Sequence, residues 1–257
     1  MPNIYFDLTR EFNRDRLVAV LSSGQAVVWY RLAIMSKDGD WILREETSAC
    51  QQVLAVLAAH GARYRPGAPL DTRWLRAGWS SHFEFTDTRS HRIRCDFVSR
   101  PPRLAEAELA TLFTRDPGHD LPVIDLPALI AIKRTQRAKD YPVIGALARL
   151  LPPAQEIEAT TDPDRVLELA PVHGAESVRE AVRLARTGAP RSDIVVALAK
   201  ENDRLQQADR RRLDRYRAAA TPFLAAWQEQ RIGDVPLPDA HEQAVRLATR
   251  LLPQTLD

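Results

Sequence analysis

The sequence is poor in cysteine, and its two cysteines, Cys50 and Cys95, stand far apart. No Cys-x-x-Cys pair is present, which argues against a zinc site built from cysteines. The chain has either one disulfide or, as we expect, two buried free thiols.

Long apolar runs are also missing. No stretch approaches the roughly 20 apolar residues that a helix needs to cross a bilayer. The first seven residues lack the basic and then apolar pattern of a secretion signal. We therefore expect a cytoplasmic protein without a membrane partner.

The chain has little excess charge of either sign, with a formal net charge of +2 and a sequence pI near 8.7. These values permit a nucleic-acid partner without arguing for one. Lysine is scarce, so arginine supplies nearly all the positive charge. With 257 residues and 45% hydrophobic residues, the chain can form one large domain or two small ones, each with a core.

The hydrophobic pattern predicts short strands in the first part of the chain. Continuous apolar residues are typical of a buried strand, and alternating segments on both sides of a turn at 87–90 are typical of a hairpin. The predicted strands are 17–21, 41–43, 63–65, 81–86 and 92–98.

Helical periodicity dominates the rest of the chain. Helices are predicted at 6–16, 25–35, 47–60, 104–113, 127–137 and 141–151, and 164–252 is largely helical. The sequence therefore predicts an α+β fold, with a sheet flanked by helices in a domain at 1–103 and a helical domain at 104–257.

The informative polar residues follow the first predicted strand. Ser23 and Gly24 form a small-residue turn that would let backbone amides approach a phosphate, and the helix after them adds its positive end. Asp38 and Asp40 lie one residue apart, so in an extended segment they point to the same side. Carboxylates arranged in this way are suited to Mg²⁺, which shares its oxygen ligands with substrate phosphates. Asp96, on the last predicted strand, can supply a third carboxylate.

In the order of these elements the sequence resembles the nucleotidyltransferase superfamily of polymerase-beta-like proteins. More narrowly, it resembles the minimal and abortive-infection (AbiEii-like) toxin-type members from bacteria. Their pattern is Gly-Gly or Gly-Ser, a helix, Asp-x-Asp, and a lone Asp on a later strand. Ser23-Gly24, Asp38-Gly39-Asp40 and Asp96 match these elements, and 125–140, which contains Lys133 and Lys139-Asp140, resembles the helix that follows.

This resemblance implies a nucleotidyltransferase-type mixed sheet and a metal-dependent transfer of NMP from an NTP to an acceptor hydroxyl. Asp38, Asp40 and Asp96 would be the catalytic residues and would hold Mg²⁺ or Mn²⁺. Ser23, Gly24 and Lys133 would bind the nucleotide. In toxin-like members the acceptor is a tRNA, another RNA or a protein hydroxyl, and a cognate antitoxin or other partner protein is implied.

Two alternatives remain open. Ser23 replaces the first glycine of the family's pair, and Gly39 stands where a β-branched residue is commoner. These departures favour a catalytically inactive nucleotidyltransferase fold that serves as a binding or regulatory module. A small-molecule adenylyltransferase of the antibiotic-modifying kind is the other alternative. An acidic acceptor cleft would favour that enzyme, and a basic cleft would favour RNA.

The six histidines show no HExxH motif or paired ligand spacing, so the sequence assigns none of them to the site. The sequence has no Gly-x-Ser-x-Gly motif that would support a Ser-His-Asp catalytic triad. Arginines cluster around Asp96 and again at 204–217. In the second cluster acidic residues are interspersed, which is typical of a solvated helix face, with an RNA contact as the alternative. The first cluster lies next to the proposed site, where its cations could meet a triphosphate or a nucleic-acid acceptor.

Overall fold

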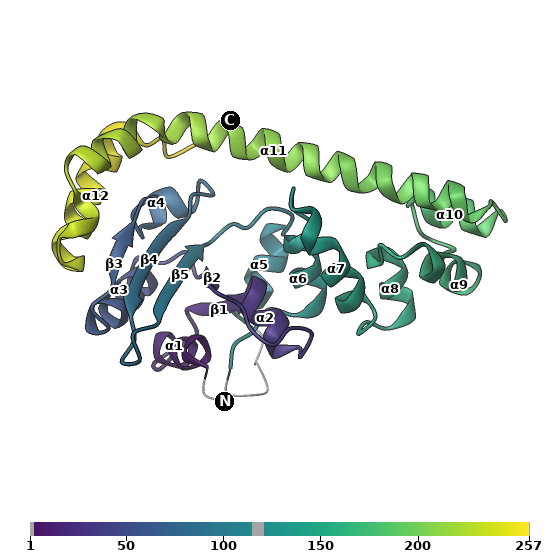
Figure 1. Cartoon of the computed structure of the whole chain (residues 1–257), viewed down its shortest axis with the longest axis horizontal. Helices are drawn as coiled ribbons and strands as arrows, with labels where there is room; N and C mark the ends of the chain where they lie inside the picture. Colours follow the sequence, from purple (N-terminus) through teal and green to yellow (C-terminus); the bar gives the residue numbers. More distant parts are fainter. Residues whose placement is uncertain (1–2, 115–120, 257) are drawn as a thin grey trace. The chain divides into compact units, whose positions relative to one another are not determined.

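The computed structural model describes residues 3–114 and 121–256. They form two compact units, the first from Met1–Ile124 and Asp214–Asp257, the second from Asp125–Leu213. The expected α+β architecture is confirmed, because a mixed sheet with flanking helices precedes a long helical region (Figure 1).

The first unit is built on a five-stranded sheet in the order β1-β2-β5-β4-β3 (Figure 1). The neighbouring strands β2 and β5 run parallel, and the other neighbours are antiparallel. The strands are β1 (Ala19–Ser22), β2 (Gly39–Leu43), β3 (Arg63–Arg65), β4 (Ser81–Thr86) and β5 (Arg92–Val98).

One face of this sheet is hydrophobic. Trp41 of β2 stacks on Phe97 of β5 with ring centroids 5.3 Å apart, and Phe12 packs edge-on against Trp41 at 5.2 Å. Each buried side chain of this size stabilises the fold by about 1.5–3 kcal/mol. The core includes residues from five helices of this unit: α1 (Ile4–Phe12), α3 (Thr47–Ala59), α4 (Thr72–Leu75), the end of α11 (Arg191–Glu229) and α12 (Leu237–Leu251).

The C-terminal residues complete this core. The hydroxyl of Tyr64 on β3 is hydrogen-bonded to Nδ1 of His241 on α12 at 2.9 Å. Trp74 Nε1 donates to the Leu252 carbonyl at 3.0 Å. Cys50 and Cys95 are both buried and free, as expected. Burial raises the pKa of Cys50 to about 12, so this thiol stays protonated and unreactive.

Helix α2 (Ser23–Trp29) is shorter than the predicted helix at 25–35. The chain leaves it at Tyr30, whose hydroxyl donates to the Ile124 carbonyl at 2.9 Å, and Arg31 then adopts a left-handed conformation with φ 61°. A residue in that conformation cannot continue a right-handed helix. The apolar residues at 32–35, which suggested a longer helix, therefore lie outside it.

The second unit is helical. Its apolar core comes from α8 (Pro153–Ala159), α9 (Pro163–His173), α10 (Glu180–Arg186) and the start of α11. Two ion pairs accompany it, Arg165 with Glu156 at 2.5 Å and Arg179 with Glu201 at 2.8 Å. The remaining elements of the chain are α5 (Glu106–Leu112), α6 (Leu126–Lys133), η1 (Ala138–Asp140), α7 (Tyr141–Ala148) and η2 (Ile232–Asp234).

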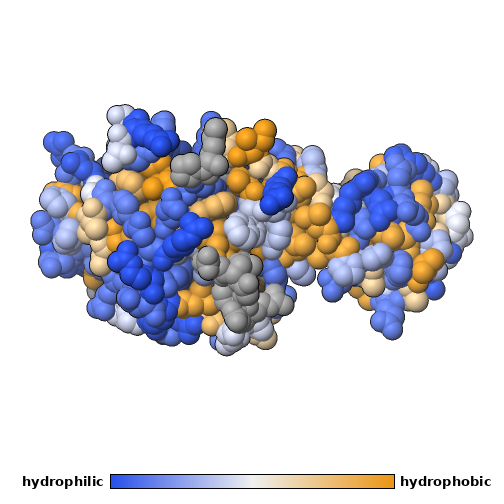
Figure 2. Space-filling model, turned by 90° about the horizontal axis from the view of Figure 1, so that it is seen from below, coloured by the Kyte–Doolittle hydropathy of each residue, from blue (hydrophilic) through white to orange (hydrophobic). Residues whose placement is uncertain are grey.

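Hydrophilic side chains dominate the surface seen in Figure 2, and hydrophobic ones gather there in smaller patches. Among the helices of the described ranges, none is both long enough and apolar enough to cross a membrane.

Candidate functional site

A row of polar side chains crosses the whole sheet on the face opposite the hydrophobic core. The strand registers pair Ser22 with Asp40, Asp40 with Asp96, Asp96 with His82, and His82 with Arg65. Paired residues point to the same face of a sheet. We call these five residues the polar row. Two of the three sequence-predicted carboxylates, Asp40 and Asp96, are thus neighbours on the parallel strands β2 and β5.

The turn after β1 lies next to the segment that carries Asp38. A Cβ at Gly24 would collide with the Ser36 side chain, so only glycine permits this approach. Gln25 Nε2 donates to the Ser36 carbonyl at 2.9 Å, and Ser22 Oγ donates to the Asp40 carbonyl at 3.1 Å. The Ser23-Gly24 turn and the Asp-x-Asp segment therefore form one packed corner.

Tyr5 of α1 fixes the same segment from the other side. Its hydroxyl donates to the Lys37 carbonyl at 2.6 Å. Burial raises the pKa of Tyr5 to about 12, so the phenol remains a donor at neutral pH. The backbone just before Asp38 is thus held by a buried aromatic side chain.

Gly39, between the two aspartates, has no room for a side chain. A Cβ there would lie 2.5 Å from Cδ1 of Tyr5 and 2.7 Å from Cζ3 of Trp41. The residue that departs from the family pattern is therefore required by the packing of two aromatic rings.

Asp38 lies on the same face as the polar row, because Arg94 Nη1 contacts its Oδ1 at 3.5 Å and Arg94 precedes Asp96 by two residues on β5. This distance exceeds that of a good hydrogen bond. Asp38 Oδ1 is buried and has no hydrogen-bond partner, although the side chain as a whole is 39% exposed. A buried carboxylate oxygen in this state is suited to a cation.

Asp96 accepts hydrogen bonds from two neighbours in the polar row. His82 Nδ1 lies 2.8 Å from Asp96 Oδ1, and Arg65 Nη1 donates to the same oxygen at 3.2 Å. On the far side of the imidazole, His82 Nε2 lies 2.9 Å from Ser80 Oγ. The side chains of His82 and Asp96 are 26% and 22% exposed, so both can be reached from solvent.

The donor types at this corner fit a divalent cation such as Mg²⁺, which prefers carboxylate oxygens. The orphaned oxygen of Asp38 supports the fit. Within residues 3–114 and 121–256, however, no three Asp, Glu, His or Cys side chains are already grouped closely enough to hold a metal together. Binding at Asp38 Oδ1 would therefore replace its contact with Arg94.

No family model matches the chain, and no curated protein matches it significantly. Two solved structures from Helicobacter pylori are similar to it. One is a proposed nucleotidyltransferase, with a TM-score of 0.42 and 13% identity, covering 81% of this chain and 96% of that one. The other is JHP933, with the same score and identity, covering 84% of this chain and 94% of that one. At this level of similarity neither likeness establishes a shared activity.

Lys133, the remaining sequence-predicted residue, belongs to the second unit. It ends α6 and is buried, with 7% of its surface exposed. Its role in nucleotide binding stays a prediction. Burial is unusual for lysine and shows that packing contributes to its position.

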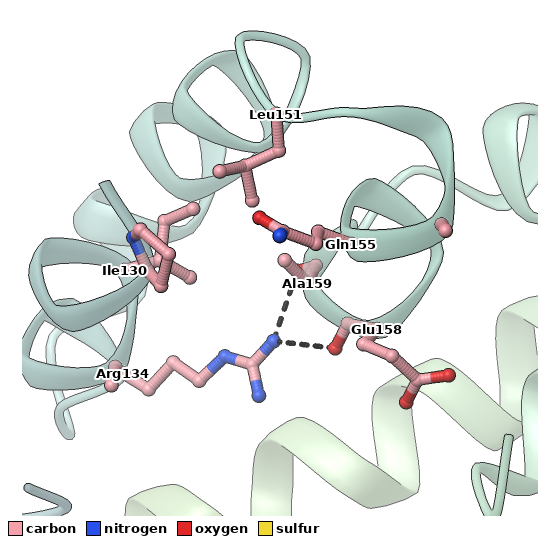
Figure 3. Close-up of a pocket in the computed structure, with 9 residues that line it drawn as sticks. Ile130, Arg134, Leu151, Gln155, Glu158 and Ala159 are labelled. Carbon is pink, nitrogen blue, oxygen red and sulfur yellow. Dashed lines mark hydrogen bonds between the residues drawn. The ribbon is translucent and has the colours of Figure 1, made fainter. Parts of the chain in front are cut away.

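A cavity of about 420 Å³ lies in the second unit between α6 and α8. Arg134, the residue after Lys133, lines this cavity, and Lys133 is not among the lining residues. Ile130 and Leu151 give it apolar walls (Figure 3). Arg134 Nη2 donates to the carbonyls of Glu158 and Ala159 at 3.2 and 3.0 Å, as Figure 3 shows. These carbonyls end α8, so Arg134 caps that helix and joins it to α6.

The sequence interpretation missed His82 and Arg65. The signal was the register of the β4–β5 hairpin, which decides what faces Asp96. Residues 87–91 connect the two strands, whose bounds are those predicted, and Asp87 Oδ1 accepts from the His91 amide at 2.8 Å at the end of this turn. This register pairs Thr86 with Arg92 and hence His82 with Asp96.

Proposed function

We propose that the chain is a metal-dependent nucleotidyltransferase that transfers NMP from an NTP to an acceptor hydroxyl. The observation that carries the proposal is the register of Asp40 and Asp96 on adjacent parallel strands, beside the corner formed by Ser23-Gly24 and Asp38. This corner combines the residue types and the order that the sequence shares with the superfamily.

In this proposal Asp38, Asp40 and Asp96 hold Mg²⁺ or Mn²⁺, which would neutralise the triphosphate and so make the pyrophosphate a better leaving group. Ser23 and Gly24 contact the β- and γ-phosphates through their backbone amides. Asp96 also orients the acceptor hydroxyl for in-line attack on the α-phosphorus. Lys133 would supply a positive charge to phosphate or base.

The charge of the polar face bears on the acceptor. Its acidic side chains are Asp38, Asp40, Glu84 and Asp96, and its basic ones are Arg63, Arg65, Arg92 and Arg94. These charges balance, so the face by itself favours neither a small-molecule adenylyltransferase, which would have an acidic cleft, nor an RNA-modifying enzyme, which would have a basic one. The acceptors to compare are therefore tRNA and other RNA, a protein hydroxyl, and an antibiotic-type small molecule. If the acceptor is an RNA or a protein, the proposal includes a toxin role and a cognate antitoxin.

One observation favours an inactive binding module instead. Arg94 and Arg65 contact Asp38 and Asp96 at 3.5 and 3.2 Å, where a metal would otherwise neutralise these carboxylates. If these contacts replace the metal permanently, the fold binds a partner and transfers nothing.

The deciding experiment incubates the protein with each labelled NTP, Mg²⁺ or Mn²⁺, and total RNA, a protein mixture or an aminoglycoside. The control is the double variant Asp38→Ala/Asp40→Ala. We expect labelled product with the parent only. We also expect the metal to raise the melting temperature of the parent, because a ligand at 100 times its Kd stabilises the fold by about 2.7 kcal/mol. The double variant should lose this gain without being less stable in the absence of metal, since two like charges are gone.

Neither product nor metal response in the parent at millimolar concentration would contradict the enzyme and favour the binding module. A metal response in the double variant equal to that of the parent would place the cation elsewhere in the molecule.

A further inference from the structure

Three side chains form a continuous hydrogen-bonded chain that ends on Asp96 of the polar row. Ser80 Oγ lies 2.9 Å from His82 Nε2, and His82 Nδ1 lies 2.8 Å from Asp96 Oδ1. An ionised carboxylate only accepts hydrogen bonds, so Nδ1 must carry a proton and donate it to Asp96. The tautomer of His82 is thereby fixed, and with a neutral ring Nε2 accepts from the Ser80 hydroxyl.

Both donors to Asp96 use the same oxygen. His82, from β4, and Arg65, from β3, each contact Oδ1, at 2.8 and 3.2 Å. Two donors on one oxygen restrict the rotation of the carboxylate. They leave Oδ2 as the oxygen that neither donor engages.

The His82 ring is itself held in place. A Cβ at Gly67 would lie 2.5 Å from His82 Cδ2, so the backbone at Gly67 closely covers the imidazole. The next residue, Ala68, donates its amide to the Ser80 carbonyl at 3.0 Å. The segment before α4 therefore fixes both Ser80 and His82, and the fold supports the position of the ring at several points.

We propose that His82 is a positioning residue, which holds Asp96 with Oδ2 presented to a divalent cation. The inference rests on the proposed function, since it takes Asp96 as a ligand of that cation. Residues that hydrogen-bond to metal ligands fix the orientation of those ligands, and their loss typically lowers metal affinity or activity about 10–100-fold. Ser80 fixes the imidazole from its other nitrogen, and Arg65 adds the second contact to Oδ1.

The test compares the parent with His82→Ala and His82→Asn, because the Asn amide can still donate to Asp96 from about the place of Nδ1. The first readout is the Mn²⁺ concentration that gives half of the maximal thermal stabilisation, without NTP. The second is kcat and KM for the NTP at saturating metal. The matched control is His91→Ala, which removes the other His–Asp pair of the same hairpin, His91 with Asp87 at 3.1 Å.

We expect His82→Ala to raise the half-saturating Mn²⁺ concentration about 10-fold or more and to lower kcat with little change in KM. His82→Asn should recover most of both effects, and His91→Ala should match the parent. Gly67→Ala, which pushes on the ring, should move the affinity in the same direction as His82→Ala.

The inference is overturned if His82→Ala binds Mn²⁺ as tightly as the parent, or if His82→Asn is no better than His82→Ala. If His82→Ala binds Mn²⁺ as tightly as the parent and the parent transfers NMP, the inference about His82 is wrong and the proposed function stands. The expected pattern of Mn²⁺ affinities without transfer from any NTP overturns only the proposed function.

Discussion

Replacing Gly39 by alanine would place a methyl group between two buried aromatic rings. The new carbon would lie 2.5 Å from Tyr5 Cδ1 and 2.7 Å from Trp41 Cζ3, well inside ordinary contact distance. Neither ring can move easily. Trp41 Nε1 donates to Thr9 Oγ1 at 2.9 Å, and the Tyr5 hydroxyl donates to the Lys37 carbonyl at 2.6 Å. Either displacement breaks a hydrogen bond or disturbs the backbone beside Asp38.

Extra carbon in a well-packed core destabilises a protein by about 1–3 kcal/mol. Removing a glycine from the unfolded chain offsets about 0.4–1 kcal/mol of this loss. We therefore expect Gly39→Ala to lower the free energy of unfolding by about 1–1.5 kcal/mol, which for a chain of this size is a fall of roughly 2–6 °C in melting temperature.

Tryptophan fluorescence is a selective assay, because every tryptophan of the chain lies in the first unit: Trp29, Trp41, Trp74, Trp79 and Trp227. Gly145→Ala is the matched control. A Cβ at Gly145 in α7 would only touch Thr161 Oγ1 at 3.5 Å, and alanine in a helix interior is favoured over glycine by about 0.5–1 kcal/mol. Its circular-dichroism melt should therefore be no lower than that of the parent. A Gly39→Ala protein that melts with or above the parent would refute the packing argument.

Three further predictions test single residues. Ser23→Gly should stabilise the first unit by about 1 kcal/mol in the fluorescence melt and keep any transfer activity, because Ser23 has φ 50° and glycine adopts this conformation freely. Lys133→Met should weaken NTP binding in a calorimetric titration; equal affinity would show that Lys133 is structural. Burial lowers the pKa of His241, so the unfolded chain takes up the proton first as the pH falls below about 6.5. Stability should therefore fall with acidification, and His241→Asn should lose that part of the pH dependence in melts at several pH values.

Local pattern predicted the strands and the common face of Asp38 and Asp40, because side-chain alternation needs no knowledge of distant contacts. It failed where the outcome depends on a partner far away in sequence. Tyr30 ends α2 through the carbonyl of Ile124, and α12 packs against β3 through His241 and Tyr64. Neither contact has a signature in the residues around it.

The neighbours of Asp96 show the same limit at shorter range. Alternation placed His82 on one of the two faces of its strand, but the register with β5 depends on the length of the turn. The pairing of Thr86 with Arg92 across the turn decides that His82, rather than the core side chain of Phe83, shares a face with Asp96. A site residue that reaches the site through strand pairing is therefore harder to predict from sequence than one that belongs to a local motif.

The two departures from the family pattern bear on whether catalysis is retained. Gly39 is explained by the rings of Tyr5 and Trp41, so its presence needs no loss of function to account for it. Ser23 keeps the left-handed backbone that a glycine would supply, at a conformational cost of about 1–2 kcal/mol. A strained residue persists only where the surrounding structure holds it, and such residues cluster at functional sites. Both departures preserve the backbone of the corner beside Asp38 and Asp40, so both are compatible with the proposed activity, and the Ser23→Gly variant is a direct test of the strain at Ser23.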